Sequence, residues 1–594
     1  MLVSTPVRRS SATQAGPDEG EGASMEYGAT LFLALVVLVI VTVAGVARRI
    51  GVAAPLALVA VGAGLSFLPG APEIHLEPEW ILAIVLPPLL YAAAVNFPLI
   101  DFRRNFGPIA ALGVALVIVS AVVVGLVLWW LLPQLDLASA IALGAVVSPT
   151  DAVSATSIAR RVGLPSRIVT ILEGESLIND ASALVLMRTA VASIAASFDL
   201  PRAVGGFLWE AIVAVAIGAV VGVLAVLVRS RFRDPVLTTS VSFVAPFLAY
   251  VPAEAAQASG VIAVVTTGLI VGHHSVRTQT AQLRFAEQTN WRTVQFLLEN
   301  GVFLLMGYQL REYLVDASQD NYGIGTTIVL GLVAVLVLVL VRLGFAFPLF
   351  ALLARRSRAI AAGRVGPLVR LGSGLRSRAA TLRGRRSARE AQRRLARREE
   401  ADRVFHEREQ LGWRSSAVIG WSGMRGVVTV AAVQTLPVET PYRSALILVA
   451  FTVAVATLLL GGLTLAPLAR RLGVREARAP AAEEIRALFG DLSRSASRLL
   501  DDPELSRDDG TPFAPEVVER VAGEVRSQDA VAERSVPSTP AGQEYAQILE
   551  LRRKVFHAQR EALADARATS TYSTVALNVA ESILNTLEAR ATED

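Results

Sequence analysis

The chain has 594 residues, of which 53% are apolar and only 18% charged, and its formal net charge is +5. It contains no cysteine, which excludes disulfides, thiolate metal sites and cysteine nucleophiles. The apolar residues lie in long blocks, such as 31–47 and 326–341, and lack the periodicity of a soluble core. Such blocks are typical of membrane-spanning helices, so we predict an all-α polytopic membrane protein.

Residues 1–24 are polar and rich in glycine, which predicts a disordered N-terminal extension before a transmembrane domain over 25–474. Within that domain the hydropathy predicts thirteen spans. They are residues 26–48, 53–69, 79–98, 106–133, 137–161, 168–197, 205–229, 235–254, 257–273, 290–314, 324–355, 413–437 and 443–470.

The loops between these spans differ in arginine content. Thirteen arginines follow the odd-numbered spans, whereas the even-numbered spans are followed by only three, which are Arg202, Arg311 and Arg443. Because arginine accumulates on the cytoplasmic side, odd spans are expected to exit into the cytoplasm. This predicts a protein of the cytoplasmic membrane with its N-terminus outside and its C-terminus inside.

The fifth span contains Ser148-Pro149-Thr150-Asp151 in the middle of an apolar segment. Ser as N-cap, Pro at the first helical position and Asp at the third are typical of a helix start. At membrane depth this pattern predicts a span broken into two half-helices, which is where unwound backbone lines ion sites. Alternatively, Asp151 only caps the second half-helix.

The sixth span opens with Glu173-Gly-Glu175-Ser176-Leu-Ile-Asn179-Asp180. A charge inside a membrane helix normally marks an ion path or a structural pair. At 100° per residue, Ser176 and Asp180 share a face with Glu173, while Asn179 lies with Glu175 on the neighbouring face. These oxygens suit a hard cation such as Na⁺, whose binding would exclude a proton. The alternative for the two glutamates is that they stabilise the helix start.

Residues 355–412 form an Arg-rich cytoplasmic loop with 17 arginines and 6 acidic residues. The loop is expected either to rest on anionic membrane lipid or to be a solvated arm. Residues 475–594 lose the apolar blocks, and helical spacing over 541–567 and 572–590 predicts a small helical cytoplasmic tail.

The twelfth span contains Trp421-Ser-Gly423-Met-Arg425-Gly426. The glycines permit unwinding, and the arginine needs a partner, for which Glu175, Asp151 or the carbonyl ends of half-helices are candidates. Arg425 is alternatively part of a purely structural ion pair. We interpret Arg342 and Glu299, in spans eleven and ten, as architectural. Two interrupted spans far apart in the chain indicate an inverted-repeat transporter.

The segment from Ser148 to Asp180, the Trp421–Gly426 stretch and residues 457–474 resemble the monovalent cation:proton antiporter-1 family, the sodium/proton exchangers. The resemblance covers roughly 26–474 and implies crossing broken helices and a homodimer. It also implies that Asp180 binds cation and proton with Ser176, Glu175 and Thr150, while Asn179, Asp151 and Arg425 stabilise the core. In this family, electroneutral members have asparagine before the aspartate, whereas electrogenic relatives have a second aspartate and a core lysine. The resemblance therefore implies electroneutral exchange for a chain with Asn179 and no core lysine.

The chain departs from this family in the third span. Where many bacterial members have an acid after the aromatic residue of this span, Tyr91 is followed by Ala92. Any role of that acid is absent here or has moved, which gives more weight to Glu175.

These observations predict an antiporter that exchanges Na⁺, or else K⁺ or Li⁺, for H⁺ and supports pH and sodium homeostasis. Its partners are small cations, protons and lipid, with no nucleic acid, and no cofactor or enzyme activity is expected. Two alternatives come from other classes. An intramembrane aspartyl protease would use Asp151 and Asp180 as a dyad, and a non-transporting sensor would use the tail as its output.

Overall fold

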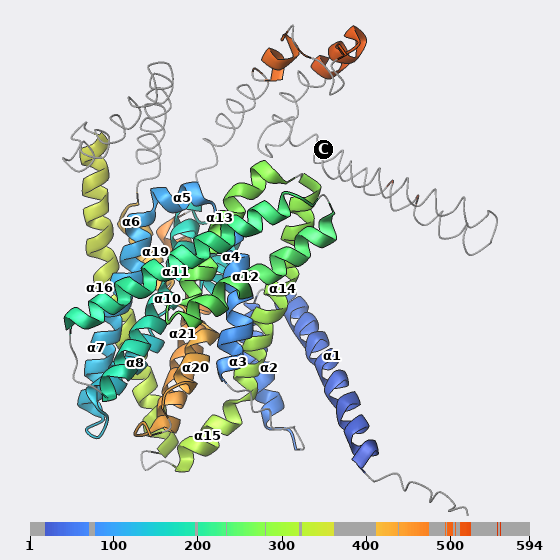
Figure 1. The fold of residues 1–594 in the computed structure, drawn as a ribbon. Coiled ribbons are helices and arrows are strands. Elements are labelled where there is room, and N and C mark those ends of the chain that lie inside the picture. The colour runs from blue at the N-terminus through green and yellow to red at the C-terminus, as the bar shows by residue number, and fades with distance from the viewer. Residues whose placement is uncertain are drawn as a thin grey trace, which may run out of the picture. The chain divides into compact units, whose positions relative to one another are not determined.

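The computed structural model describes residues 18–50, 52–69, 78–195, 200–232, 234–279, 281–319, 323–361, 411–437 and 439–474, together with short stretches beyond residue 493. The chain divides into two compact units, Met1–Glu476 and Ala477–Asp594. The described residues of the first unit form helices and their connections (Figure 1), which confirms the predicted all-α fold. Most of the arginine-rich loop and nearly all of the two predicted tail helices lie outside the described residues.

The helices of the first unit follow the predicted spans closely. In chain order they are α1 (Asp18–Ile50), α2 (Ala54–Ser66), α3 (Pro78–Trp80), the π-helix η1 (Ile81–Val85), α4 (Leu86–Val95), α5 (Leu99–Arg104), α6 (Phe106–Ala110), the π-helix η2 (Ala111–Ala115), α7 (Leu116–Leu131), α8 (Leu137–Val146), α9 (Ala152–Val162), α10 (Ser166–Ala195), α11 (Leu200–Arg229), α12 (Pro235–Ala255), α13 (Gly260–Thr278), α14 (Ala281–Tyr308), α15 (Leu310–Gln319), α16 (Gly323–Ala361), α19 (Trp413–Trp421), α20 (Val427–Gln434) and α21 (Arg443–Leu472).

Six of the described helical segments are long and apolar enough to cross a membrane, namely Phe106–Leu131, Ser166–Ile194, Gly205–Arg229, Pro235–Ala255, Gly323–Arg355 and Arg443–Leu472. Shorter apolar helices accompany them, among them Ala54–Ser66 and Leu137–Val146. The protein is therefore polytopic, and the count of thirteen crossings stays a prediction.

Two helices start furthest from their predicted starts. The helix α1 already begins at Asp18, so residues 18–24 are helical where a disordered extension was predicted. The helix α14 begins at Ala281, nine residues before the predicted start of span ten, and ends at Tyr308. Hydropathy marks only the apolar part of a helix, and a helix that continues beyond the lipid with polar residues extends past that mark.

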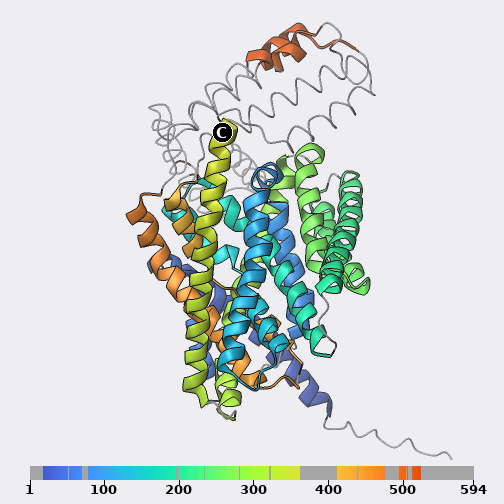
Figure 2. The ribbon, with the colours of Figure 1, turned by 90° about the vertical axis from the view of Figure 1, so that its left-hand side faces the viewer.

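The helices of the first unit pack in two groups. The first group contains α1, α2, α4 and α11 to α14, and the second contains α6 to α10, α16 and α19 to α21. Within the second group α16 lies between α7 and α21 (Figure 2). The two groups meet mainly along α10, α14 and α20.

Candidate functional site

The two interrupted spans cross at their interruptions. The helix α8 ends at Val146 and α9 begins at Ala152, while α19 ends at Trp421 and α20 begins at Val427. The backbone N–H of Asp151 in the first break donates to the carbonyl of Met424 in the second at 2.7 Å. This bond joins residues 273 positions apart in the chain, and it confirms the predicted crossing of broken helices.

The first break differs from its prediction in how the second half-helix starts. Ser148 was expected as N-cap, but its hydroxyl donates to the Gly144 carbonyl at 2.6 Å and so belongs to the end of α8. Asp151 is the cap of α9 instead, because its Oδ2 accepts from the backbone N–H of Ser154 at 3.2 Å. Pro149 and Thr150 therefore stay extended, and their backbone groups are free for partners outside the helix.

Thr150 holds this extended stretch against α10. Its carbonyl and its hydroxyl accept from Asn179 Nδ2 at 3.1 and 2.9 Å, and its hydroxyl donates to Glu175 Oε1 at 3.1 Å. All three side chains are buried. Buried polar groups remain stable only when they are hydrogen-bonded, so Asn179 acts here as a clamp that fixes the break to the sixth span.

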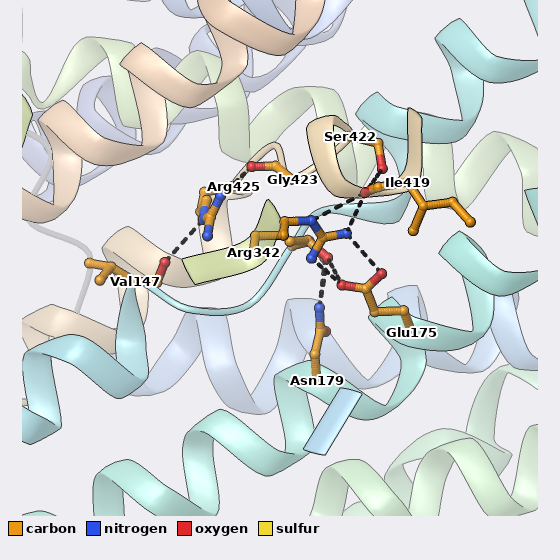
Figure 3. Close-up of polar contacts among 9 residues, drawn as sticks. Val147, Glu175, Asn179, Arg342, Ile419, Ser422, Gly423 and Arg425 are labelled. Atoms are coloured by element: carbon orange, nitrogen blue, oxygen red, sulfur yellow. Dashed lines mark hydrogen bonds and ion pairs between the residues drawn. The ribbon is translucent and has the colours of Figure 1, made fainter. Parts of the chain in front are cut away.

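Glu175 forms an ion pair with an arginine that the sequence did not indicate as its partner. Its two carboxylate oxygens accept from Arg342 of α16 at 2.5 and 2.9 Å, and the exposed fractions of the two side chains are 1% and 3%. Arg342 also donates to the carbonyl of Ile419 at the end of α19 (Figure 3). An arginine thus already neutralises both oxygens of Glu175, which favours a structural role for this residue over the predicted role as a cation ligand.

Arg425 is balanced by carbonyl groups. Its Nε donates to the Val147 carbonyl at 3.2 Å, and its Nη1 donates to the Gly423 carbonyl (Figure 3). Val147 is the C-cap of α8, where the helix dipole places partial negative charge. Of the three predicted kinds of partner, the carbonyl ends of half-helices are the ones that the structure shows.

A cavity of about 550 Å³ lies between the two helix groups. Asp180, Ser176 and Thr150 line it together with Asp151 and Glu173, whereas Glu175 does not. Asp180 is partly buried, and its carboxylate makes no ion pair within the described residues. Three of the four residues predicted to bind the ion thus share one cavity.

One end of this cavity is open and the other is closed by apolar side chains. Exposed residues such as Asn96, Ser157, Arg160 and Arg292 line the open end. At the opposite end the buried residues Ile81, Val302 and Ala431 form a separate apolar cluster with Leu82, Val85 and Leu305 around it. This cluster joins η1 and α14 to α20.

The role of Thr150 as a link gives a first testable prediction. The isosteric change Thr150→Val removes the hydroxyl and leaves buried polar groups of Glu175 and Asn179 with one partner fewer. We expect the free energy of unfolding to fall by about 1–3 kcal/mol. Equilibrium unfolding of the purified protein in detergent measures this loss. The matched variant Thr150→Ser keeps the hydroxyl and is expected to retain most of the stability; equal losses in both variants would contradict the assigned role.

Two residues that the sequence analysis set aside as architectural belong to this region. Arg342 neutralises Glu175, and Glu299 of α14 lines the same cavity as Asp180. The available signal was that each is a charge inside an apolar span. Their partners could not be read from the sequence, because they lie on other helices.

A crossing of two interrupted helices beside a cavity lined with carboxylates defines a secondary ion transporter. Residues 33–471 match the family model for the transmembrane region of sodium/hydrogen exchangers. The chain belongs to this family.

Several members of this family are similar to the chain in sequence or in fold. An uncharacterized Na⁺/H⁺ exchanger of Mycobacterium bovis is 29% identical over 75% of this chain and 74% of its own length. The Na⁺/H⁺ antiporter ApNhaP of Aphanothece halophytica is 28% identical over 70% of this chain and 69% of its own length. The fold is similar to that of the sodium proton antiporter MjNhaP1 of Methanocaldococcus jannaschii, with a TM-score of 0.54 and 15% identity over 75% of this chain and 99% of the other.

Proposed function

We propose that this protein exchanges a monovalent cation for a proton across the membrane and that Asp180 carries both in turn. The observation that supports this most is the position of Asp180, an acid without an ion-pair partner among the described residues, on the wall of a cavity between two helix groups. A carboxylate in this position can hold either a proton or a cation, so loading one releases the other.

The proposed cation ligands are the oxygens of Asp180, Ser176 and Thr150. Glu175 is not among them, because Arg342 already binds both of its carboxylate oxygens. Carboxylate, hydroxyl and carbonyl oxygens replace the water that a hard cation loses on binding. Asn179, Asp151 and Arg425 hold the crossing in place through the hydrogen bonds described above.

The cation is proposed to be Na⁺, K⁺ or Li⁺. A relative in Bacillus subtilis, 29% identical over 53% of this chain and 49% of its own length, is a sodium, potassium, lithium and rubidium/H⁺ antiporter, which supports testing several cations. In proteoliposomes with an acidic interior and a trapped pH dye, adding at least one of these cations outside is expected to alkalinise the interior. No response to any of them, at any pH from 6 to 9, would contradict the proposed function.

Transport is proposed to follow alternating access. The open end of the cavity is lined by Arg160 and Arg292, which flank spans that are expected to exit into the cytoplasm. This structure then corresponds to an inward-facing state, and the apolar cluster of Ile81, Val302 and Ala431 closes the outer side. Opening outward requires this cluster to part while α10 moves relative to α14.

We further propose that the protein lies in the cytoplasmic membrane as a homodimer, with its N-terminus outside and its C-terminus in the cytoplasm. The arginine asymmetry of the loops supports this orientation. Its activity is transport alone. The protease alternative finds no support, because Asp151 caps α9 and so cannot act as the free partner of a catalytic dyad.

The exchange is expected to be electroneutral, with one proton for one cation, because the residue before Asp180 is an asparagine and the chain has no core lysine. A membrane potential imposed on proteoliposomes by a thiocyanate gradient should then leave the initial exchange rate unchanged. An exchange rate that rises or falls with the sign of the potential would show that net charge moves in each cycle.

A further inference from the structure

One face of α14 forms a polar path into the cavity. Gln288, Arg292, Gln295 and Glu299 all line the cavity, and their spacing of four, three and four residues places them on one side of the helix. Val302 and Phe303 continue this face as apolar residues, and Val302 belongs to the cluster that closes the outer end. Glu299 is therefore the innermost polar group on this wall.

Glu299 differs in its partners from four other glutamates of the helix bundle. Glu173, Glu175, Glu254 and Glu287 each form an ion pair with an arginine of another element or turn, namely Arg160, Arg342, Arg188 and Arg229. Glu299 forms no such pair within the described residues, and its hydrogen bond there is a long one of 3.4 Å from Gln295 Nε2. An acid at membrane depth without a cationic partner indicates a functional group rather than an architectural one.

The position of Glu299 complements that of Asp180. Asp180 lies on α10 of the second helix group, and Glu299 lies on α14 of the first, so the two carboxylates belong to opposite walls of the same cavity. The cavity wall next to Tyr91, where the resemblance leads one to expect an acid, is occupied by Ala92 in this chain. A carboxylate on the wall opposite Asp180 is thus present in this chain but comes from a different helix.

We propose that Glu299 is a second carboxylate ligand of the transported cation, which it binds from the wall opposite Asp180. The proposal rests on the proposed exchange function. A cation that leaves water between two helix groups needs oxygen ligands from both, and a carboxylate on α14 supplies the negative charge that no other group of that wall offers. The exchange stays one for one, because in this proposal Glu299 remains ionised throughout the cycle and only Asp180 gains and loses a proton.

The test compares Glu299→Gln with the unaltered protein in proteoliposomes, over a series of Na⁺, K⁺ and Li⁺ concentrations at fixed pH. We expect the half-saturating cation concentration to rise about tenfold, with the maximal rate largely retained. Glu79→Gln, the same chemical change on an exposed residue of α3 outside the cavity, is the matched control and should leave both values unchanged. Cation binding to the purified variant, followed by calorimetry, should weaken by the same factor.

A purely structural role predicts a different result. Loss of packing would lower the maximal rate or the yield of folded protein without a shift in half-saturation, and that outcome would overturn the proposal. If Glu299→Gln does not fold, Glu299→Asp is used for the test, because aspartate keeps the carboxylate charge on a side chain that is one methylene shorter. An unchanged half-saturation in that variant would equally overturn it.

The same experiment separates the two proposals. If the unaltered protein exchanges cations for protons and Glu299→Gln has normal half-saturation, only the role of Glu299 fails. If the unaltered protein exchanges none of the three cations, the proposed function itself fails.

Discussion

Replacing Asp180 with asparagine is expected to reduce cation-driven proton movement to the level of protein-free liposomes. Asparagine has the shape of aspartate but can neither release a proton nor neutralise a cation, so both half-reactions are lost together. Asp180 lies on the cavity wall and has no ion-pair partner among the described residues, so no other role of its charge is expected to be disturbed. Dye fluorescence in proteoliposomes or everted vesicles measures the effect.

The control for this variant is Asp316→Asn, the same substitution on an exposed residue of α15 that does not line the cavity. It is expected to transport normally. Exchange that persisted in Asp180→Asn at a rate similar to that of this control would mean that the carrier lies elsewhere in the cavity, with Glu299 as the first group to test.

Breaking the buried pair between Glu175 and Arg342 is expected to destabilise the fold strongly. Either Glu175→Gln or Arg342→Gln leaves one charge buried without its counter-charge, which costs about 3–5 kcal/mol. The double variant Glu175→Gln with Arg342→Gln removes both charges and should recover a large part of this loss. The free energy of unfolding of the purified protein in detergent is the measured quantity.

A second ion pair of the same chain is a natural control for this experiment. Arg188 and Glu254 join α10 to α12 at 2.9 Å, but their side chains are 44% and 29% exposed. A solvated pair of this kind contributes about 0–1 kcal/mol, so Arg188→Gln and Glu254→Gln should change stability little. Similar losses in the buried and the exposed pair would contradict the view that burial determines the effect.

The sequence allowed the broken helices to be predicted because their signal is local. A serine, a proline and an acid at the spacing of a helix start favour a new helix inside the fifth span, and the glycines around Arg425 permit unwinding in the twelfth. The exact capping residue was wrong, since Thr150 is held extended by Asn179, a contact across two spans. Helix ends, in contrast, depended on where polar residues continue a helix beyond the lipid, as in α14.

The partners of the buried charges could not be derived in the same way. Glu175 and Arg342 are 167 residues apart, and nothing in the sequence favours Arg342 over Arg425 as the arginine that reaches Glu175. The choice depends on the packing of α16 against α19 and on the position of the α8 C-terminus, which takes the charge of Arg425. The position of Glu299 on the cavity wall likewise depends on how α14 packs against the other helix group, which the sequence does not indicate.

The arrangement of charges suggests how the site is kept ready for exchange. Arg342 donates to Glu175, and Arg425 donates to the carbonyl groups of Val147 and Gly423; neither arginine forms an ion pair with Asp180. The crossing is held by hydrogen bonds of the backbone and of the Asn179 amide, together with the carboxylate of Asp151 that caps α9. We expect proton exchange at the carboxylate of Asp180, which forms no ion pair within the described residues.

The central claim is that a cation and a proton compete for Asp180, and proton release on cation binding tests it most directly. Na⁺, K⁺ or Li⁺ is added to the purified protein in weakly buffered detergent solution, and the released protons are counted with a pH indicator. The account predicts one proton released for each cation bound, and no release from Asp180→Asn. Cation binding without proton release, or equal release from the variant, would contradict it.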